Sequence, residues 1–323
     1  MRHTVRESAH QPPGASTTGA QETAQGGPGR GATGISWVRR LGWYARLTRL
    51  DKPIGIYLLL WPTLDALWVA AGGWPGLERV AIFCVGTVLT RSAGCAINDV
   101  ADRRFDGHVE RTAGRVLAQG LVSPREALWV GAVLAALAAL TLPLLNPAVL
   151  PLALVAVAIS VSYPYFKRFF PMPQAYLGIA FSFGIPMAFA DVHGHVPPLG
   201  WWLFAANMFW VIAYDTEYAM VDRRDDLRIG IRSSAILFGH ADLVAVGLCY
   251  GVYLAMLARL ALAMHLGWAF GLGWLAALLS ALRHLWWIRT REPQRCLQAF
   301  RDNHWLGLFI FVGVVAGFAL RSA

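Results

Sequence analysis

Long apolar blocks separated by short polar segments dominate the chain from residue 54 onwards. About twenty apolar residues are enough for a helix to cross a bilayer, and most blocks reach or approach that length. We predict nine membrane spans, at 54–74, 80–98, 126–145, 148–163, 174–191, 199–217, 240–262, 268–288 and 304–320. The pattern therefore predicts an all-α integral membrane protein with nine transmembrane helices.

The first part of the chain has a different pattern. Residues 1–33 are rich in Gly, Pro, Ser, Thr and Gln and contain few large apolar residues. Such a segment cannot bury enough apolar surface to fold, so we expect a disordered tail over 1–33 and a membrane domain over 34–323. The tail lacks the apolar core of a secretory signal peptide. Residues 34–52 mix basic and aromatic positions, which is typical of an amphipathic segment at the membrane surface.

Charge and composition refine this topology. The chain has 323 residues, 56% of them hydrophobic and 15% charged, and a net charge of +9. Loops after even-numbered spans carry fifteen basic residues, whereas loops after odd-numbered spans carry one, Arg79. The positive-inside rule then places the N-terminus and every even-numbered loop in the cytoplasm.

Because the basic residues lie in short loops, nucleic acid is not an expected partner. A bacterial inner membrane is the expected location, with the mitochondrial inner membrane as the alternative.

The four cysteines form no C-x-x-C pair, and three lie in or beside apolar blocks. We therefore predict free, structural thiols rather than a disulfide or zinc framework.

Two acidic clusters stand directly after predicted spans. In the first, Asn98, Asp102 and Asp106 follow one another at intervals of four, and Asp99 lies between them. If the helix continues past the membrane edge, the three spaced side chains share one face, where like charges repel unless something compensates them. Nearby arginines could compensate in part, and a hard divalent cation with oxygen ligands would do so better. The alternative is a solvated loop of mixed charge.

The second cluster contains Asp222 and Asp226, again four apart and accompanied by an Arg-Arg pair. Asp215 and Tyr218 fall on the same helical face. Ionisable groups at membrane-helix ends are functional candidates, and two such clusters on one side of the membrane favour a shared site. Carboxylates and arginines together suit a polyanion held through Mg²⁺, for which an allylic lipid diphosphate is a fitting substrate. A secondary transporter is the alternative class, although transporter sites usually lie near the membrane midplane.

The two clusters resemble the aspartate-rich motifs of the UbiA superfamily of membrane prenyltransferases. Several further stretches resemble the branch of that superfamily that acts in ubiquinone biosynthesis, over about residues 40 to 320. They are Arg49-Leu50-Asp51-Lys52-Pro53-Ile54-Gly55, Leu60-Trp61-Pro62-Thr63, Gly94-Cys95-Ala96-Ile97-Asn98-Asp99, Phe105-Asp106-Gly107-His108-Val109, Tyr163-Pro164 with Lys167-Arg168, and Tyr214-Asp215-Thr216-Glu217-Tyr218-Ala219-Met220-Val221-Asp222.

The resemblance implies a bundle around a central cavity, with a cytoplasmic cap that carries both motifs. It implies an enzyme that moves a polyprenyl group from polyprenyl diphosphate to the carbon ortho to the hydroxyl of 4-hydroxybenzoate, giving 3-polyprenyl-4-hydroxybenzoate and diphosphate. Mg²⁺ would bridge the diphosphate to both motifs. The implied metal ligands are Asn98, Asp99, Asp102, Asp106, Asp222 and Asp226, of which Asp102, Asp106, Asp222 and Asp226 are also the implied catalytic residues.

The candidate substrate-binding residues are Arg49, Arg103, Arg115, Lys167 and Arg223. Lys167 suits the diphosphate, and Arg49 suits either the benzoate carboxylate or a lipid headgroup. Arg91 lies two helical turns deeper than Asn98, where a bare cation is costly, so we expect it to pair inside the bundle or near the substrate.

The sequence departs from the family pattern at three positions. Gly114 and Val116 replace a common Asn and Pro, and Glu217 stands where Gln is common. These changes bear on loop geometry and substrate preference more than on the reaction class. Haem farnesyltransferases and the enzymes that add tails in menaquinone or chlorophyll synthesis are the nearest alternatives within the superfamily.

Overall fold

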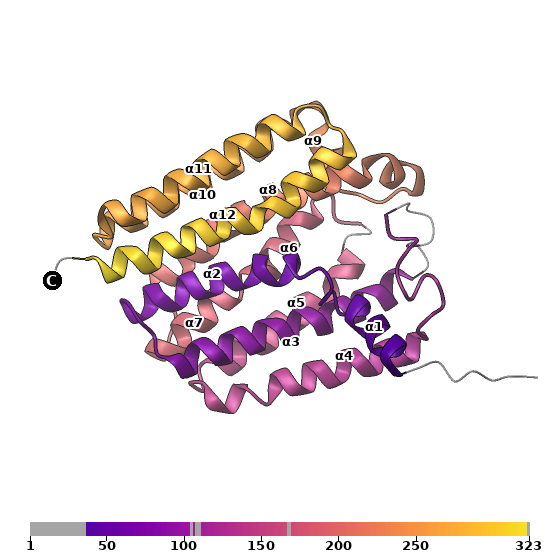
Figure 1. Ribbon diagram of the computed structural model, residues 1–323, viewed down its shortest axis with the longest axis horizontal. Coiled ribbons are helices and arrows are strands. Elements are labelled where there is room, and N and C mark those ends of the chain that lie inside the picture. Colours follow the sequence, from indigo (N-terminus) through magenta and orange to yellow (C-terminus); the bar gives the residue numbers. More distant parts are fainter. Residues whose placement is uncertain (1–36, 104–105, 107–110, 167–168, 322–323) are drawn as a thin grey trace, which may run out of the picture. The chain divides into compact units, whose positions relative to one another are not determined.

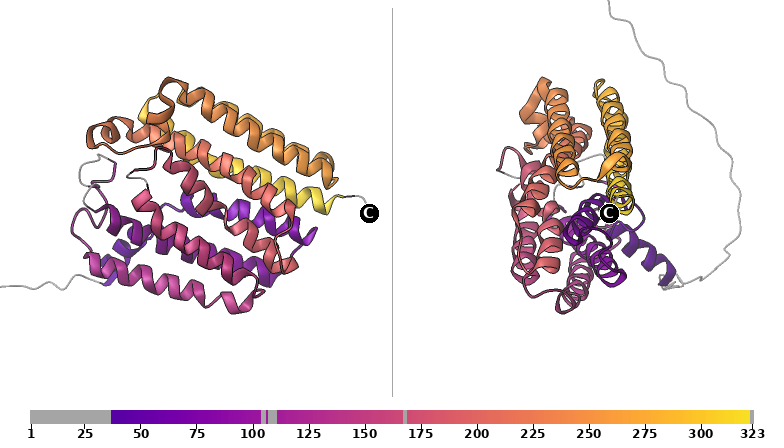
Figure 2. Two further views of the ribbon diagram at one scale, coloured as in Figure 1. Left: turned by 180° about the vertical axis from the view of Figure 1, so that it is seen from behind. Right: turned by 90° about the vertical axis from the view of Figure 1, so that its left-hand side faces the viewer.

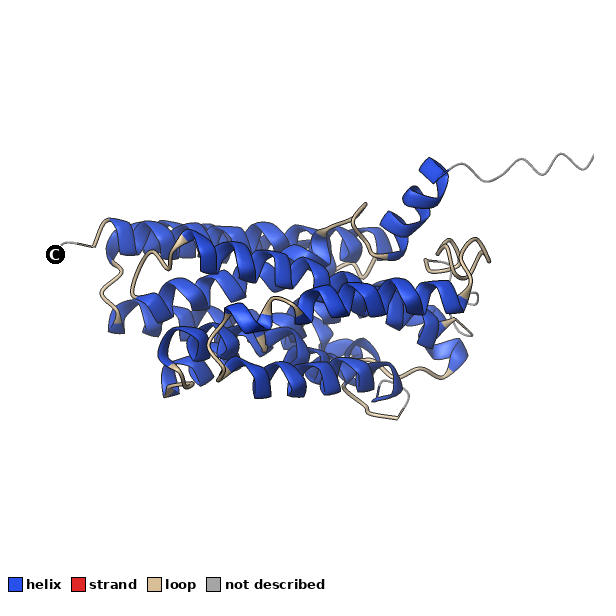
Figure 3. Ribbon diagram, turned by 90° about the horizontal axis from the view of Figure 1, so that it is seen from below, coloured by secondary structure: helices blue, strands red, loops and turns tan. Residues whose placement is uncertain are grey.

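A computed structural model describes residues 37–103, 106, 111–166 and 169–321 of the chain. This part of the chain is helical and contains no strand (Figure 3). The elements are α1 (Trp37–Leu47), α2 (Ile54–Ala71), α3 (Leu77–Asp102), α4 (Pro124–Ala139), η2 (Leu142–Leu144), α5 (Val149–Phe166), α6 (Pro173–Ser182), α7 (Gly184–His193), α8 (Pro198–Ile229), α9 (Ser234–Phe238), η3 (Gly239–Ala241), α10 (Asp242–Ala263), α11 (Gly267–Ile288) and α12 (Pro293–Ala319). The predicted all-α class is confirmed, whereas the tail predicted over residues 1–33 lies outside the described residues.

Eight helical segments of the described chain are long and apolar enough to cross a membrane. They correspond to eight of the predicted spans. The remaining one, 199–217, lies in α8, which has 32 residues but a more polar composition that includes Asn207 and Asp215. A polytopic helical membrane protein is therefore supported, and the count of nine spans stays a prediction.

The predicted span 174–191 is built from two helices, α6 and α7, with Phe183 between them. Pro186 lies in the first turn of α7 and has no backbone N–H to donate to the Ser182 carbonyl, which favours the break. Gly184 allows α7 to approach α2 closely, since a β-carbon there would lie 3.1 Å from the Cβ of Thr63.

Neighbouring helices pack in pairs. α11 lies beside α12, α3 packs against α4, and α8 contacts α6, α10 and α12 (Figures 1 and 2). The backbones of α11 and α12 approach each other closely at Gly273 and Gly313. A β-carbon on Gly273 would lie only 2.8 Å from the Cα of Gly313, so a larger residue would not fit there. Small residues permit such close approach between membrane helices, where van der Waals packing replaces the hydrophobic effect as the main driving force.

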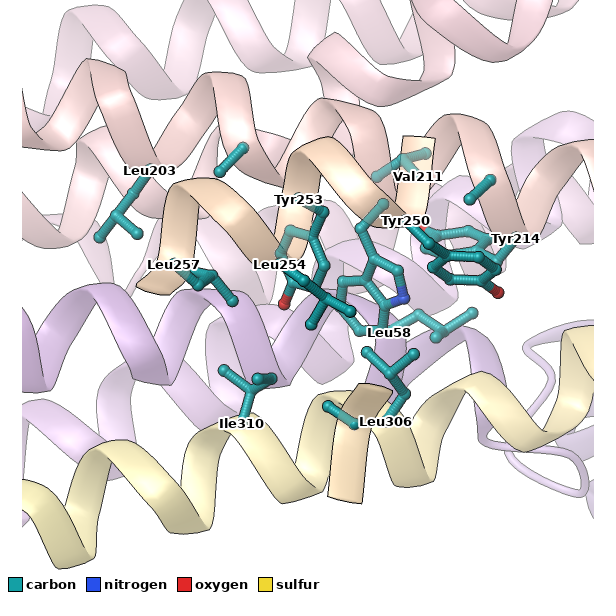
Figure 4. Packing of buried hydrophobic residues seen from close by; sticks show 14 of the residues in the cluster. Leu58, Leu203, Val211, Tyr214, Tyr250, Tyr253, Leu254, Leu257, Leu306 and Ile310 are labelled. Carbon is teal, nitrogen blue, oxygen red and sulfur yellow. The ribbon is translucent and has the colours of Figure 1, made fainter. Parts of the chain in front are cut away.

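The core lies between α2, α8, α10 and α12 (Figure 4). Trp210 of α8 is fully buried and stacks on Tyr253 of α10 with ring centroids 5.5 Å apart. Leu58 of α2 and Leu306 of α12 enclose the same region. This packing fixes α8, which carries the second acidic motif.

Helix α1 diverges from the bundle (Figure 2). Its last residue, Leu47, is buried, whereas Trp37, Val38 and Leu41 are exposed. This amphipathic distribution agrees with the expectation for a segment at the membrane surface.

Candidate active site at one end of the bundle

The first acidic motif occupies the end of α3. Asp99 and Asp102 are buried, with exposed fractions of 1% and 4%. α3 ends at Asp102, so the expected single helical face stops there and Asp106 lies beyond the helix. Carboxylates are unfavourable at a helix C-terminus, which carries negative partial charge, and this favours ending the helix within the cluster. Asp106 is nevertheless 6% exposed and remains close to the other acidic residues.

Two arginines neutralise this motif. Nη2 of Arg49 donates to both carboxylate oxygens of Asp99, at 2.7 and 3.0 Å. Nη1 of Arg115 donates to both oxygens of Asp106, at 2.9 and 2.8 Å, and lies 3.2 Å from Oδ1 of Asp99. Asp99 is thus held between two guanidinium groups.

The second motif lies near the C-terminal end of α8. Nε of Arg111 donates to both oxygens of Asp222 at 2.9 Å, and Nη1 of Arg111 donates to the hydroxyl of Tyr218. The Arg111 guanidinium lies 4.3 Å from the centre of the Tyr218 ring, which also stacks on Phe300 of α12 at 4.3 Å. The stack fixes the orientation of Arg111 toward Asp222.

The segment between α3 and α4 joins the motifs. Arg111 pairs with the second motif, whereas Arg115, four residues later, pairs with the first. The hydroxyl of Thr112 donates to the backbone carbonyl of Asp106 at 2.8 Å, which braces the turn. Val116, one of the departures from the family pattern, is 1% exposed and packs in a small core with Leu47. Arg111 and Arg115, which lie four residues apart in sequence, therefore connect the second predicted motif with the first.

The surroundings of Asp106 change the pKa of its carboxyl group. The pKa of Asp106 is raised above its usual value, because burial penalises the charged form more than Arg115 stabilises it. Asp99 and Asp102 add to this increase by repulsion. Asp106 is therefore easier to protonate than an ordinary aspartate until a cation compensates its charge.

Arg91 lies deeper in α3, within the bundle. Its guanidinium lies 5.1 Å from the centre of the Phe181 ring and fits against Gly55, where a β-carbon would approach it to 2.7 Å. Its Nε is buried and has no hydrogen-bond partner among the described residues. Tyr163 of α5 interacts electrostatically with Arg91, Asp215 and Asp102. These residues form a polar region directly below the acidic motifs.

The opposite face of α8 carries a buried polar network. Glu217 accepts hydrogen bonds from the Tyr250 hydroxyl at 2.9 Å and from Nδ2 of Asn303 at 2.8 Å. Oδ1 of Asn303 accepts from Nε1 of Trp210 at 2.9 Å. The network ties α8 to α10 and α12. Glu217, the third departure from the family pattern, therefore faces the helix packing rather than the acidic motifs.

The other predicted substrate contacts are placed differently. Arg223 donates to Asp242 of α10 at 3.0 Å, where Arg291 also binds. Arg103 is exposed at the end of α3, and Lys167 lies outside the described residues. Asp226 lies one turn beyond Asp222 on α8.

Sequence reasoning did not single out Arg111 as a partner of Asp222 or Phe300 as a neighbour of Tyr218. The sequence comparison with the family pattern led us to expect phosphate binding at Arg111 and Arg115, but it did not pair Arg111 with a carboxylate. Phe300 belongs to the last helix, and no spacing in the sequence connects it with the motif.

The donor set suits Mg²⁺, although no three or more His, Cys, Asp and Glu side chains converge on one point among the described residues. Mg²⁺ is commonly held by one or two carboxylates and completes its shell with water and substrate phosphates. Oδ1 of Asn98 is buried and has no hydrogen-bond partner in the described part of the chain. It is therefore available as an additional oxygen ligand.

The fold and the site define a polytopic helical membrane protein with two acidic motifs joined at one end of the bundle. The model of the UbiA prenyltransferase family matches residues 59–313. The chain belongs to this family.

Relatives and solved structures agree with that assignment. A 4-hydroxybenzoate octaprenyltransferase from Nitrosospira multiformis is 55% identical over 90% of this chain and all of its own length. One from Burkholderia vietnamiensis is 54% identical over 88% of this chain and 99% of its own. A UbiA homologue from Aeropyrum pernix K1 superposes with a TM-score of 0.70 at 27% identity, covering 81% of this chain and 96% of its own. A homologue from Archaeoglobus fulgidus bound to GPP and Mg²⁺ shares the fold, with a TM-score of 0.63 at 19% identity, covering 85% and 99%.

Proposed function

We propose that the protein transfers a polyprenyl group from its diphosphate to the carbon ortho to the hydroxyl of 4-hydroxybenzoate, in ubiquinone biosynthesis. Octaprenyl diphosphate is the donor that the names of the relatives support. The observation that carries the proposal is the junction of the two acidic motifs through Arg111 and Arg115. A diphosphate bound there would touch both motifs at once.

Asn98, Asp102 and Asp106 would hold Mg²⁺ on one side of the site, and Asp222 and Asp226 would hold it on the other. When bound, the metal neutralises the negative charge that develops as diphosphate leaves. The oxygen donors of these side chains support this assignment, as does the Mg²⁺ bound to the Archaeoglobus homologue of the same fold. Asp99 instead neutralises Arg49 and Arg115, because its side chain is 2% exposed and already bonded to both.

Arg111 and Arg115 would contact the diphosphate when Mg²⁺ and substrate are bound, exchanging their carboxylate partners Asp222 and Asp106 for phosphate. Guanidinium groups bind carboxylate and phosphate with the same planar fork, so the exchange keeps their hydrogen bonds. Lys167 and Arg103 complete the contacts to the diphosphate. Arg223 contributes only through its position on α8, since it is bonded to Asp242.

Arg91 binds the carboxylate of 4-hydroxybenzoate. It is a cation within the bundle that has no ion-pair partner among the described carboxylates. Tyr163 interacts electrostatically with Arg91, Asp215 and Asp102. With its carboxylate on Arg91, the acceptor would direct its phenol end toward the departing diphosphate. The ring carbon then attacks the allylic carbon, the C–O bond to diphosphate breaks, and the ring proton is lost to restore aromaticity.

The site faces the cytoplasm in a bacterial inner membrane. α8 spans about 48 Å at 1.5 Å per residue, which exceeds the roughly 30 Å hydrocarbon layer. Its last part, with Asp222 and Asp226, therefore extends beyond that layer. The loop arginines on this side support the cytoplasmic orientation, and α8 supplies the ninth span.

The test uses membranes that contain the protein, labelled 4-hydroxybenzoate and octaprenyl diphosphate, with and without Mg²⁺. Label should enter the lipid phase only with Mg²⁺ and an intact Asp102. No transfer by the folded protein with any prenyl length would refute the benzoate assignment.

A second comparison tests Arg91. Arg91→Met should raise KM for 4-hydroxybenzoate about 10- to 150-fold, as expected for loss of a charge-assisted bond of about 1.5–3 kcal/mol. It should change turnover of the neutral 4-hydroxybenzamide much less. Arg259→Met is the matched control, because Arg259 lies 5.9 Å from the Trp202 ring, away from the site. An equal effect on the acid and the amide would remove Arg91 from the acceptor site.

A further inference from the structure

A polar pocket lies at the end of the bundle opposite the acidic motifs. It has a volume of about 440 Å³ and is formed by the start of α3, η2 and the end of α7. This size falls in the range of pockets that hold small ligands. Neither the metal site nor the acceptor site uses any of its residues.

Arg79 provides the cationic part of the pocket. Its Nε donates to Oδ2 of Asp191 at 3.0 Å, and Oδ1 of Asp191 accepts from the backbone N–H of Asn146 at 2.9 Å. The Asp191 side chain is 4% exposed, whereas that of Arg79 is 47% exposed. Asp191 therefore fixes one edge of the guanidinium. The two Nη groups have no partner among the described residues and remain able to donate to a phosphate.

Glu78, the neighbouring residue, provides an anionic group in the same pocket. Its side chain is exposed and forms no ion pair with any described residue. A carboxylate of this kind suits a primary ammonium group, which offers three N–H donors. Adjacent positive and negative groups thus match a zwitterion that carries both a phosphate and an ammonium.

The rim of the pocket is apolar. Leu77 and Leu144 line the pocket and are 74% and 62% exposed, and Trp74, which is 65% exposed, directly precedes the lining residue Pro75. Tryptophan is enriched where membrane helices reach the lipid headgroups, and these residues lie at the ends of helices long enough to span the bilayer. A ligand in this position has its polar part in the pocket and its apolar part beside the rim.

We propose that the pocket binds the headgroup of a phospholipid with a primary ammonium group, phosphate on Arg79 and ammonium on Glu78. Phosphatidylethanolamine has this chemistry. Phosphatidylcholine has the phosphate but no ammonium N–H, and phosphatidylglycerol lacks the cation. The lipid would link the α2–α3 connection to α7 at the face of the protein opposite the catalytic site.

Native mass spectrometry of the delipidated full-length protein in detergent tests this proposal, with each of the three lipids titrated separately. Phosphatidylethanolamine should bind at least tenfold more tightly than phosphatidylcholine. Glu78→Gln should abolish this preference while leaving phosphatidylcholine binding unchanged, and it keeps the Arg79–Asp191 pair intact. Arg79→Gln should weaken both lipids. Glu292→Gln, at an exposed position near the start of α12, is the matched control and should alter neither.

Equal binding of the two lipids by the unaltered protein would refute the proposal, as would a preference that survives in Glu78→Gln. Soluble glycerophosphoethanolamine distinguishes a lipid from a free solute. If it displaces the lipid at comparable concentration, the pocket binds a soluble phosphate compound and the lipid assignment fails. The variants also retain prenyl transfer, because the pocket lies apart from the acidic motifs.

Discussion

Asp99→Asn and Asp102→Asn are matched substitutions in the same acidic motif, and we expect the first to act mainly on stability and the second mainly on catalysis. Asp99 is bonded to Arg49 and Arg115, so its loss leaves two guanidinium groups without their shared anion. Breaking a fully buried pair costs about 3–5 kcal/mol. The arginine side chains are 26% and 18% exposed, so water replaces part of the interaction and we expect a loss of about 1–3 kcal/mol.

For a protein of this size, about 1–3 kcal/mol corresponds to a decrease in Tm of roughly 1.5–4.5 °C. Asp102→Asn should instead act on catalysis, because it removes the charge of a proposed metal ligand beside Asp106. It should lower prenyl transfer at least about a hundredfold and increase the Mg²⁺ concentration needed for half-maximal activity. Asp99→Asn should reduce activity less, with an unchanged Mg²⁺ requirement.

Tryptophan fluorescence during thermal unfolding, without substrate or metal, measures the first effect, and prenyl transfer across a Mg²⁺ titration measures the second. An Asp99→Asn protein with unaltered Tm and a greatly increased Mg²⁺ requirement would refute the reasoning. Asp99 would then act as a metal ligand, as the sequence alone suggested.

Three further outcomes are expected. Arg111→Lys should raise KM for the prenyl diphosphate about tenfold in steady-state assays, because lysine lacks the planar fork that Arg111 directs at Asp222; an unchanged KM would argue against phosphate contact. Mg²⁺ activation should weaken as pH falls, because protonated Asp106 binds the metal poorly. Since the pKa of Asp106 is raised, this weakening should begin at a higher pH than it would for an ordinary aspartate. A Mg²⁺ titration at several pH values measures this, and an acid-insensitive titration would contradict it. Asn303→Leu should lower stability by about 2–5 kcal/mol in thermal unfolding, because it leaves Oε2 of Glu217 and Nε1 of Trp210 buried without their hydrogen-bond partner; a stability loss below 1 kcal/mol would contradict it.

The sequence predicted helix positions well where apolar blocks were long and uninterrupted. It placed 268–288 within two residues of α11 (Gly267–Ile288), since a membrane helix must satisfy its own backbone hydrogen bonds. It missed the break between α6 and α7, because one proline near a helix start is also compatible with a continuous helix. It ended the predicted span at residue 217, where hydropathy falls, although the helical spacing of Asp215, Tyr218 and Asp222 already indicated the longer helix that α8 forms to Ile229.

The sequence predicted the acidic residues of the candidate site but not their arginine partners. The regular spacing of Asn98 and Asp102, and of Asp222 and Asp226, pointed to both motifs. Their arginine partners were not assignable, because many loop arginines satisfy the positive-inside pattern equally well. Which of them reaches a given carboxylate depends on the turn after α3, and contacts across that turn are set by tertiary packing.

The backbone contact between Gly273 and Gly313 has a consequence for how the chain enters the membrane. α11 and α12 are joined by a short connection and carry charges that neutralise one another, since Asp302 of α12 bonds to Arg283 and His284 of α11. Inserted separately, each helix would bring an unpaired ionisable group toward the lipid, which is costly. If the two helices insert together as a hairpin, these groups are already paired when the helices enter the membrane. We therefore expect the last two helices to leave the translocation machinery as one unit, and the close glycine contact to be made before the rest of the bundle assembles.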